Sequence, residues 1–512
     1  MSSLNQKAEY FLTIDAGTSG VKTGIGTPDG TIIKVVKTHW SYYSPKELEP
    51  YGVEFDPDDF WHKILLTLKA VINQSGIDSD LISCIAVTSQ RHGLVCIDDN
   101  GKELYSAPNR DARGLEVDIE EYIDLETLYE ITGQNPPFLF VPARYLWLKE
   151  NEEVIFSKIA KILPINSWIV NKFTKSSVVD ITTASSTQLV DLKKQNWSEK
   201  ILEKISLPKE LLPEIVPIGF PIGPIKSEVC SELGLNTDTI VTLSGADTQS
   251  AILGTGASNI GDVVIVAGST MPIVQLLNNP IIDSDNNLWS GSYFGENKWL
   301  IEANVAGGSI KEWFVKSFLE QKSSDPENQH KIFEQIAKNK KPGSDDIIMD
   351  LGIELFNWEK MTDIILSSIT FPSALYDVNS SLDLGSFCRG ILENIAFAIR
   401  GNIELLINFS NLPAENIFIV GGLSRSSLLR EILADVLNKD IKFSHPEGTT
   451  IGGFIACALA KKYYSSINDS KSIFKDKIQV ITPNQENVQT YDHIYRKWLN
   501  SYRKRRENTD EF

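Results

Sequence analysis

The sequence predicts an α/β protein of two domains. With 512 residues the chain is too long for a single compact core. Its first third places strand-like apolar runs ahead of a helix and a further buried strand, an order that is typical of α/β proteins. A related strand-and-turn pattern returns in the middle of the chain. We therefore expect an N-terminal domain over residues 1–250 and a C-terminal domain over residues 251–512.

Three antiparallel strands open the first domain in this prediction. The first two are joined by the turn at Gly17–Gly20, and Thr27–Gly30 forms a second turn before the strand Thr31–Lys37. A helix then starts near Asp56, with carboxylates at its N-terminal end and apolar residues at helical spacing. The apolar run Leu81–Thr88 is typical of a buried parallel strand.

The turn after the first strand has the composition of a phosphate-binding loop. Asp15 ends the apolar run, and Gly17, Thr18, Ser19 and Gly20 follow it. Small residues leave the backbone N–H groups of such a turn accessible to phosphate oxygens. A carboxylate at the strand end is well placed to act on the same phosphates through a metal ion. Taken alone, an ordinary hairpin turn explains the pattern equally well.

Two further junctions resemble this one. Thr239–Gln249 is a strand that ends in a small-residue turn containing Asp247, and Gly261–Thr270 is a strand that runs into Gly268, Ser269 and Thr270. The repetition leads to the hypothesis of two related α/β halves that face one another across a cleft.

A third junction is Asn416–Ser426, where a strand meets the pair Gly421 and Gly422 and then the start of a helix. Such a junction admits a planar ligand beside the backbone, and the helix N-terminus can accept a polar or anionic group. A tight turn that needs glycine for steric reasons is the alternative for an isolated case.

The composition limits which binding partners and which cellular compartment we expect for the protein. The net charge of −18 disfavours nucleic acid and anionic membranes, and the basic cluster Arg503–Arg506 is better explained as a solvated helix end. No stretch is apolar and long enough to span a membrane. Because the cysteines are scattered and odd in number, we expect buried free thiols and a cytoplasmic protein. These cysteines are Cys84, Cys96, Cys230, Cys388 and Cys457.

The assembled motifs carry a family resemblance that spans nearly the whole chain. In order they are Asp15–Lys22, Ser89–Gly93, Asp111–Arg113, Ala143–Asn151, Asp180–Thr187, Gly245–Gln249, Gly268–Thr270, Ala306–Trp313, Arg389–Phe397, Gly421–Ser426 and Glu447–Gly453. Their order and spacing resemble the FGGY family of carbohydrate kinases. The resemblance implies two actin/hexokinase-like (ribonuclease H-like) domains that face each other across a cleft, and ATP-dependent phosphorylation of a hydroxyl group on a small sugar or polyol.

The resemblance also implies roles for individual residues. Asp247 corresponds to the general base, and Asp15 and Asp247 would hold Mg²⁺ through waters. The implied substrate contacts are Arg91, His92, Asp111, Asp247 and Gln249. The implied ATP contacts are Gly17, Thr18, Ser19, Lys22, Gly268, Ser269, Thr270, Gly308, Gly421, Gly422 and Ser426. For His92, a purely structural histidine after a buried strand is the alternative.

Several positions depart from the family pattern. Arg144 replaces a usual lysine, Leu423 replaces a third glycine, and the spacing from Gly245 to Asp247 is one residue shorter. Asn109 stands where many members have tryptophan.

Two further departures bear on the substrate: Gln90–Gly93 combines the Gln-Arg of glycerol kinases with the His-Gly of xylulokinases, and residues 347–358 lack the Pro-x-x-x-Gly-Glu-Arg loop of typical sugar kinases. These two departures and Asn109, together with Glu54–Asp56 and Asn109–Arg113, most resemble members that phosphorylate a quorum-sensing autoinducer, an open-chain dihydroxypentanedione. A ketopentose is the other substrate that stays open. A nucleotide-dependent sensor of the same fold without kinase turnover is the alternative function, and a homodimer stays open as well.

Overall fold

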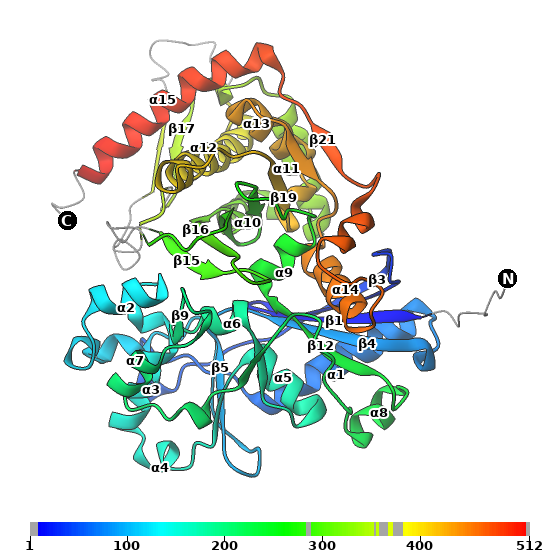
Figure 1. The fold of residues 1–512 in the computed structure, drawn as a ribbon. Helices are drawn as coiled ribbons and strands as arrows, with labels where there is room; N and C mark the ends of the chain where they lie inside the picture. Colours follow the sequence, from blue (N-terminus) through cyan, green and yellow to red (C-terminus); the bar gives the residue numbers. More distant parts are fainter. Residues whose placement is uncertain (1–8, 283–287, 353–354, 358–366, 372–381, 508–512) are drawn as a thin grey trace. The chain divides into compact units, whose positions relative to one another are not determined.

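The computed structural model describes residues 9–282, 288–352, 355–357, 367–371 and 382–507. The chain forms two compact units, and both contain helices and sheet strands (Figure 1). Unit 1 comprises Met1–Ser258, Leu277–Leu300 and Glu447–Lys475, and unit 2 comprises Asn259–Leu276, Ile301–Pro446 and Asp476–Phe512. The predicted α/β class is confirmed. The chain therefore enters unit 1 three times.

Unit 1 is built on a five-stranded mixed sheet in the order β12-β4-β1-β2-β3. The first three strands along the chain are antiparallel to one another, as predicted, whereas β4 is parallel to β1 and β12 is parallel to β4. Their bounds are β1 Tyr10–Gly17, β2 Gly20–Gly26, β3 Ile32–His39, β4 Ile82–Ser89 and β12 Ile240–Ala246.

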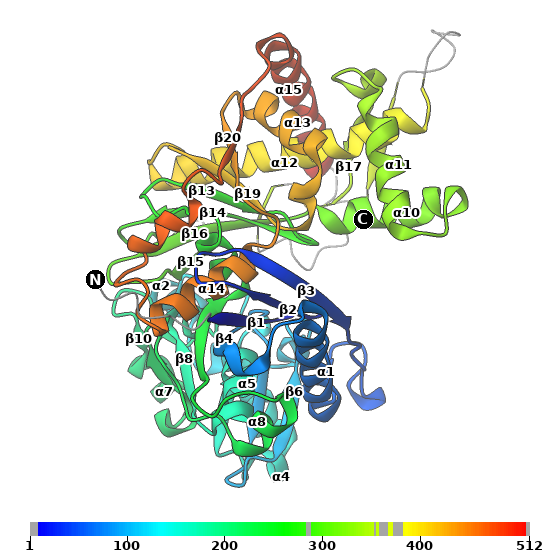
Figure 2. The same cartoon turned by 90° about the vertical axis from the view of Figure 1, so that its right-hand side faces the viewer.

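Helices cover both faces of this sheet. Successive residues of β1 point to opposite sides, and apolar residues occur on both sides, so each face needs a helix to bury it. Leu12 and Ile14 pack in one core with helices α1 (Pro57–Ser75) and α5 (Ile165–Thr174). Phe11 packs in another core with helix α14 (Gly448–Ala460), which Figure 2 shows beside β1 and β4. Asp15 shares the face of Phe11, so its side chain belongs to the side that α14 covers.

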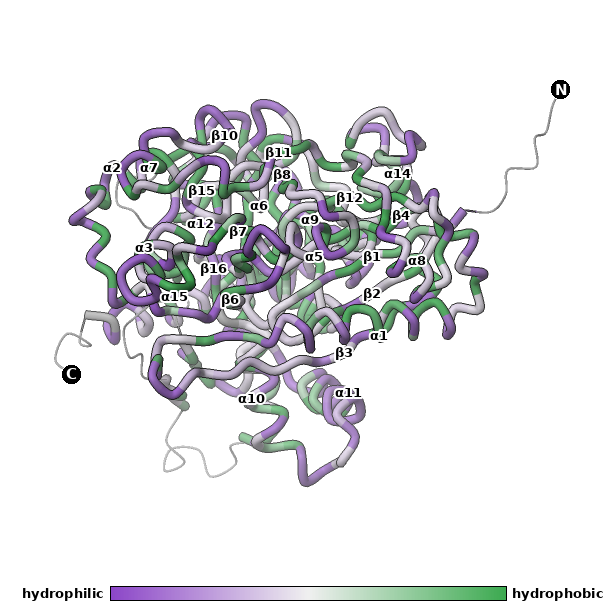
Figure 3. The backbone as a smooth tube through the Cα atoms, turned by 90° about the horizontal axis from the view of Figure 1, so that it is seen from below, coloured by the Kyte–Doolittle hydropathy of each residue, from purple (hydrophilic) through white to green (hydrophobic). Residues whose placement is uncertain are grey.

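Helix α1 follows the rules of an amphipathic helix. Asp56 caps its start by accepting hydrogen bonds from the backbone N–H groups of Asp58 and Asp59, and Gly76 ends it in the left-handed conformation. Its buried residues, among them Phe60 and Leu68, recur at helical spacing, and hydrophobic and hydrophilic stretches alternate along it in Figure 3. The helix predicted near Asp56 is confirmed.

Helices α9 (Asp247–Leu253) and α14 approach one another closely because glycines line their contact. A Cβ atom on Gly452 would lie 2.1 Å from the backbone oxygen of Ser250, and one on Gly254 would lie 2.0 Å from that of Gly448. No larger residue fits at either position without a shift of backbone. This close packing sets the position of the α14 N-terminus above the sheet.

Shorter elements complete unit 1. A three-stranded sheet has the order β6-β5-β7, and two two-stranded sheets pair β8 with β11 and β9 with β10. The strands are β5 Leu94–Ile97, β6 Glu103–Ala107, β7 Lys161–Pro164, β8 Val178–Asp180, β9 Val190–Asp191, β10 Asn196–Trp197, β11 Glu214–Val216 and β15 Trp289–Ser292. The helices are α2 Leu125–Thr132, α3 Val141–Asn151, α4 Glu153–Phe156, α6 Ile181–Ser185, α7 Glu199–Lys204 and α8 Ser227–Leu233.

Unit 2 contains the neighbouring strands β16-β14-β13-β19-β20-β21, with β13 parallel to β19 and β19 parallel to β20. The strands are β13 Val263–Val266, β14 Thr270–Leu277, β16 Trp299–Ala306, β19 Ile417–Val420, β20 Ile441–Phe443 and β21 Gln479–Ile481, and β17 Ile348–Asp350 pairs with β18 Ser368–Thr370. The helices are α10 Gly308–Leu319, α11 Pro326–Lys338, α12 Leu384–Ser410, α13 Ser427–Leu437 and α15 Gln485–Glu507. Helix α12 packs against α11 and α13.

The predicted strand–turn junctions are confirmed as β12 to α9, β13 to β14, and β19 to the start of α13. All five cysteines are buried and unpaired, which confirms the predicted free thiols.

We predict that Gly452→Ala destabilises unit 1. The added Cβ overlaps backbone rather than a mobile side chain, and overpacking of this kind costs about 1–3 kcal/mol. Thermal unfolding followed by circular dichroism should show a midpoint lowered by several degrees. Gly223→Ala is the matched control, because no atom lies within 4 Å of the added Cβ there. Equal midpoints for both variants would contradict the close packing of α9 and α14.

Candidate active site

The carboxyl ends of three parallel strands lie together at one edge of the unit 1 sheet. Ala16 of β1 is in register with Ser89 of β4, and Ser89 is in register with Ala246 of β12. Adjacent strands are about 4.8 Å apart, so Ala16 and Ala246 are separated by about 10 Å. Asp15 precedes the first of these residues and Asp247 follows the last. The register therefore brings two acidic residues that are far apart in sequence to one edge.

Asp15 takes part in a cluster with residues from two other elements. Its Oδ2 atom lies 3.2 Å from Nζ of Lys22 on β2 and accepts a hydrogen bond of 2.7 Å from Oγ1 of Thr449. Nζ of Lys22 also lies 3.0 Å from Oε2 of Glu447, immediately before α14. Lys22 thus bridges two carboxylates. Glu447 lies in a motif quoted above, but the sequence assigned it no role, and it assigned none to Thr449.

The electrostatic balance of this cluster favours a charged lysine. Burial by itself lowers the pKa of Lys22, but Asp15 and Glu447 outweigh burial and raise it above its usual value. None of the hydrogen bonds among the described residues uses Oδ1 of Asp15. That oxygen is therefore available to a water-bound Mg²⁺, an ion that keeps several waters and needs few carboxylates.

The hairpin tip between β1 and β2 is held by a polar network. Tyr42 donates a hydrogen bond of 2.6 Å to the backbone oxygen of Thr18, and Gln90 donates one to the Tyr42 hydroxyl. The side-chain amide of Asn109 donates to Oγ1 of Thr18 at 3.1 Å. In the described part of the chain, the backbone N–H groups of Thr18 and Ser19 make no hydrogen bond. These two donors can serve an anion while the network fixes the loop.

Asp247 lies near Arg91, a predicted substrate contact in the segment that follows β4. Its Oδ1 is 4.0 Å from Nε of Arg91, and its side chain is 32% exposed against 11% for Arg91. The Arg91 guanidinium carbon lies 5.9 Å from the ring centre of Trp289, and the rings of Trp289 and His92 are 5.8 Å apart. Trp289, on β15, was not identified from the sequence. The structure brings Arg91, His92 and Asp247 together as one group.

Gln249 follows Asp247 on α9 and is almost fully buried. Its Oε1 atom has no hydrogen-bond partner among the described residues. A buried amide oxygen without a donor is costly, so a ligand or water that donates to it would be bound favourably.

His92 is held as a neutral ring with one unsatisfied nitrogen. Its Nδ1 lies 3.0 Å from the backbone oxygen of Ser186, which can only accept, so Nδ1 carries the proton. Burial, followed by the charges of Arg91 and Arg144, lowers the pKa of His92 to about 3. Nε2 is therefore an acceptor, and it is buried without a partner among the described residues. This geometry suits an incoming hydroxyl group.

Arg144, the replacement for a family lysine, fixes the backbone of this turn. Its guanidinium donates to the backbone oxygens of His92, Pro108, Leu139 and Phe140, and its side chain is fully buried. Arg144 therefore connects the turn after β4 to two neighbouring loops, and its hydrogen bond to the backbone oxygen of His92 helps to hold that residue in place.

Asp111, a predicted substrate contact, is fully buried. One oxygen accepts from the backbone N–H of Val53 at 2.9 Å, the other accepts from the Tyr105 hydroxyl at 2.5 Å, and Nε of Arg113 lies within 3.0 Å of both. Arg113 also forms an ion pair with Glu54, with 2.8 Å between its Nη2 and Oε1 of Glu54. These partners use most of the acceptor capacity of Asp111, an arrangement that favours a supporting role for it. Its contact with substrate stays a prediction.

The segments of unit 2 that hold the predicted ATP contacts Gly268, Gly308 and Gly421 adjoin one another. The backbone N–H of Gly308 donates to the oxygen of Gly268 at 3.1 Å, and a Cβ on Gly308 would lie 2.3 Å from that oxygen. Gly421 has φ of 100°, and its Cβ would lie 2.7 Å from the oxygen of Ala267. No atom lies within 4 Å of a Cβ built on Gly422. The loops pack through glycines, and the space beside Gly422 can admit a planar ligand.

Ser269 and Thr270 are exposed in the turn from β13 to β14. The backbone oxygen of Ser269 accepts a hydrogen bond of 3.1 Å from the N–H of Ser309, in the first turn of α10. The second predicted phosphate turn is therefore fixed against the start of α10, where the N–H groups of Gly308 and Ser309 donate to carbonyl oxygens of the turn itself.

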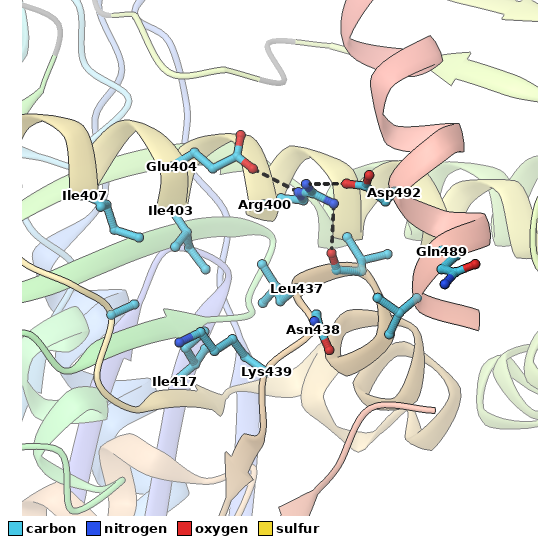
Figure 4. Close-up of a pocket in the computed structure, with 13 residues that line it drawn as sticks. Arg400, Ile403, Glu404, Ile407, Ile417, Leu437, Asn438, Lys439, Gln489 and Asp492 are labelled. Carbon is cyan, nitrogen blue, oxygen red and sulfur yellow. Dashed lines mark hydrogen bonds and ion pairs between the residues drawn. The ribbon is translucent and has the colours of Figure 1, made fainter. Parts of the chain in front are cut away.

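A separate pocket of 380 Å³ lies in unit 2 between α12, α13 and α15 (Figure 4). Arg400 at its edge donates to Glu404, to Asp492 and to the backbone oxygen of Val436. All three nitrogens of its guanidinium are thus engaged with the protein. The pocket contains none of the residues predicted for catalysis or binding.

Two negative findings bear on the site. Among the described residues, no three His, Cys, Asp or Glu side chains gather as a metal-binding group. Within the same part of the chain, no helix is both long enough and apolar enough to cross a membrane.

Comparison with protein families gives two adjoining matches. Residues 10–254 match the N-terminal domain of the FGGY family of carbohydrate kinases, and residues 263–461 match its C-terminal domain. The chain belongs to the FGGY family of carbohydrate kinases. The predicted family and the predicted enzyme class are confirmed.

Individual relatives cover nearly all of the chain. YoaC of Bacillus subtilis, whose name places it among sugar kinases, is 27% identical over 456 residues, which are 88% of this chain and 90% of the relative. The autoinducer-2 kinase of Enterobacter sp. (strain 638) is 25% identical over 509 residues, or 96% of this chain and 94% of the relative.

Solved structures share the fold. The ligand-bound xylulose kinase of Lactobacillus acidophilus has a TM-score of 0.82 at 21% identity and covers 96% of this chain and 97% of its own. Glycerol kinase of Plasmodium falciparum with ADP has a TM-score of 0.81 at 21% identity, with coverage of 96% and 98%. These neighbours confirm the predicted actin/hexokinase-like fold.

We predict a pH dependence of stability that arises from His92. Because its pKa is lowered on folding, the unfolded chain binds this proton between the ordinary pKa of 6.5 and a pH of about 3, and stability falls as pH falls through that window. Between pH 7.5 and 5.5, the wild type should lose about 1.4 kcal/mol more than His92→Asn. Urea unfolding at both pH values measures this difference.

The exposed His493 supplies the control for this experiment, since His493→Asn should keep the wild-type pH dependence. If His92→Asn loses as much stability as the wild type on acidification, His92 is not held neutral in the folded protein.

Proposed function

We propose that this carbohydrate kinase transfers the γ-phosphoryl group of ATP to a hydroxyl of a small open-chain five-carbon substrate. The autoinducer dihydroxypentanedione is the first candidate, and a ketopentose is the second. Full-length similarity to autoinducer-2 kinases supports the first. The departures from the common family motifs at Asn109 and around Glu54 support it as well.

The observation that carries the proposal is the geometry around Asp247. This partly exposed carboxylate lies at the end of β12, at the same sheet edge as Asp15, with Arg91 at 4.0 Å. A general base needs an accessible carboxylate beside the group that binds the acceptor. Asp247 satisfies both requirements.

Asp247 accepts the proton of the attacking hydroxyl in this mechanism. The hydroxyl oxygen forms a bond to the γ-phosphorus, the bond from that phosphorus to the β–γ bridging oxygen breaks, and its electron pair leaves with ADP. Because the transition state is loose, the alcohol loses its proton late, and a carboxylate is a sufficient base. The protein contributes mainly position and charge.

The substrate is oriented by groups on the turn after β4. The unpaired Nε2 of His92 accepts a hydrogen bond from a substrate hydroxyl, and Arg91 donates to a carbonyl or hydroxyl oxygen. Trp289 presents an apolar ring beside both residues. A few polar groups beside one aromatic ring are typical of a site for a small polyol.

Phosphate groups are bound by backbone donors and lysine. In unit 1, the N–H groups of Thr18 and Ser19 and the Nζ of Lys22 are the phosphate donors. In unit 2, the predicted contact is the turn at Gly268–Thr270, whereas the N–H of Gly308 already donates to the backbone oxygen of Gly268. Asp15, through Oδ1, and Asp247 are the residues that would hold Mg²⁺, which would neutralise phosphate charge. Gly421 and Gly422 admit the adenosine.

We expect Asp247→Asn to lower kcat by at least about 100-fold, since it removes the proton acceptor and general base catalysis contributes about 10²–10⁴-fold. ADP should still raise the unfolding temperature of the variant as it does that of the wild type. The control Asp238→Asn changes an exposed aspartate in the turn before β12 and should keep wild-type turnover. Normal turnover of Asp247→Asn would remove it from the role of base.

A coupled ADP-release assay tests the substrate. A compound should be phosphorylated only when its hydroxyl and carbonyl groups match the donors and acceptors of the site. Dihydroxypentanedione, xylulose, ribulose, glycerol and gluconate are therefore assayed separately. We expect kcat/KM for dihydroxypentanedione to exceed every other value by about tenfold or more. A higher value for xylulose or ribulose would select the second candidate. ADP release at background with all five compounds would contradict the proposed substrates.

A further inference from the structure

Glu334 lies among the predicted nucleotide loops, although the sequence gave no reason to select it. This residue on α11 contacts the starts of two other helices of unit 2. Its Oε1 lies 2.8 Å from Nζ of Lys311, in the first turn of α10, and its Oε2 accepts a hydrogen bond of 2.7 Å from Ser426, the N-cap of α13. Helix α10 begins at Gly308, and Ser426 ends the segment that begins at Gly421.

Ser426 has already used its only donor. Its hydroxyl donates to Glu334 and accepts from the backbone N–H of Leu429. A serine hydroxyl carries one proton, so in this arrangement Ser426 cannot donate to a nucleotide. The side chain of Ser426 therefore orients the Glu334 carboxylate, and Glu334 becomes the candidate for the contact with the nucleotide.

Glu334 retains capacity for further donors. An ionised carboxylate offers about four lone-pair sites, and within the described part of the chain only Lys311 and Ser426 donate to this one. Its side chain is 27% exposed, whereas that of Lys311 is 8% exposed. The carboxylate is thus oriented by two buried or nearly buried partners, while part of its side chain stays accessible.

The local charge suits a site near an anion. Lys311 compensates Glu334, and its ammonium also lies 4.9 Å from the ring centre of Phe333. A lone carboxylate would repel a phosphate chain, but the ion pair has no net charge. The pair can therefore offer acceptors to the nucleoside without opposing the phosphates.

We propose that Glu334 binds the nucleoside half of ATP by accepting a hydrogen bond from a ribose hydroxyl or from the amino group of the base. The inference rests on the proposed function, because it assumes that ATP is the phosphoryl donor. Carboxylates commonly accept hydrogen bonds from ribose hydroxyls in nucleotide sites. Glu334 would make the kinase selective for nucleotides that carry the donor.

Isothermal titration of the full-length chain with ADP, 2′-deoxy-ADP, 3′-deoxy-ADP and IDP tests the proposal. For the wild type, at least one analogue that lacks a donor should bind about tenfold more weakly than ADP, as expected for one hydrogen bond to a charged group. The Glu334→Gln variant should bind ADP about tenfold more weakly than the wild type does. On this variant, the analogue that discriminates on the wild type should bind as well as ADP. The analogue identifies the donor as ribose hydroxyl or amino group.

Two further variants separate recognition from structure. Lys311→Met/Glu334→Gln removes both charges and leaves no buried ammonium unpaired, so it should fold and show the same loss of selectivity. Glu327→Gln changes an exposed carboxylate on the same helix, and its selectivity should equal that of the wild type. Unchanged ADP affinity in both Glu334 variants, or unchanged selectivity, would overturn the inference. Absence of ADP binding to the wild type would instead overturn the proposed use of ATP.

Discussion

The parallel pairing of β1 and β12 with the central strand β4 is the constraint on which the unit 1 site depends. Register fixes Ala16, Ser89 and Ala246 side by side, so the residues that follow each strand emerge at one edge. A shift of one residue in β1 would turn Asp15 away from α14 and towards the opposite core. The hydrophobic alternation of Phe11 and Leu12 prevents such a shift, because each residue fills a different core. Packing of the sheet therefore fixes the chemistry at its end.

The second requirement is a close approach of α14 to the same sheet. Gly453 leaves room for Thr13, since a Cβ there would lie 2.6 Å from the Thr13 methyl group, and Gly452 admits the backbone of α9. The start of α14 consequently delivers Thr449 to Asp15, more than four hundred residues later in the chain. The small residues of this helix are explained by contact distance rather than by helix propensity, since glycine weakens an isolated helix.

Local patterns in the sequence predicted the parts of the site that lie within one element. Asp15 with its turn, the strand before Asp247 and the glycine pair at Gly421 all follow from strand length and turn composition. Tertiary partners could not be predicted in this way. Trp289 reaches His92 from a strand almost two hundred residues further on, and the unpaired Nε2 of His92 depends on a backbone oxygen of another segment. Asp111 matched a family motif, but its burial is set by partners from three segments that no local pattern reveals.

Charge pairing is a feature that the predicted nucleotide contacts of the two units share. The chain has a net charge of −18, which by itself would repel a nucleoside triphosphate. Each unit places a lysine shortly after a glycine that the family resemblance implies as an ATP contact, Lys22 after Gly17 in unit 1 and Lys311 after Gly308 in unit 2, and pairs its ammonium with a carboxylate. The pairing restricts the rotamers of each lysine, so less side-chain entropy would be lost when a nucleotide binds beside it. In unit 1, Asp15 and Glu447 also raise the pKa of Lys22. Binding by such groups would depend on local, oriented hydrogen-bond donors, and it would not require a basic surface.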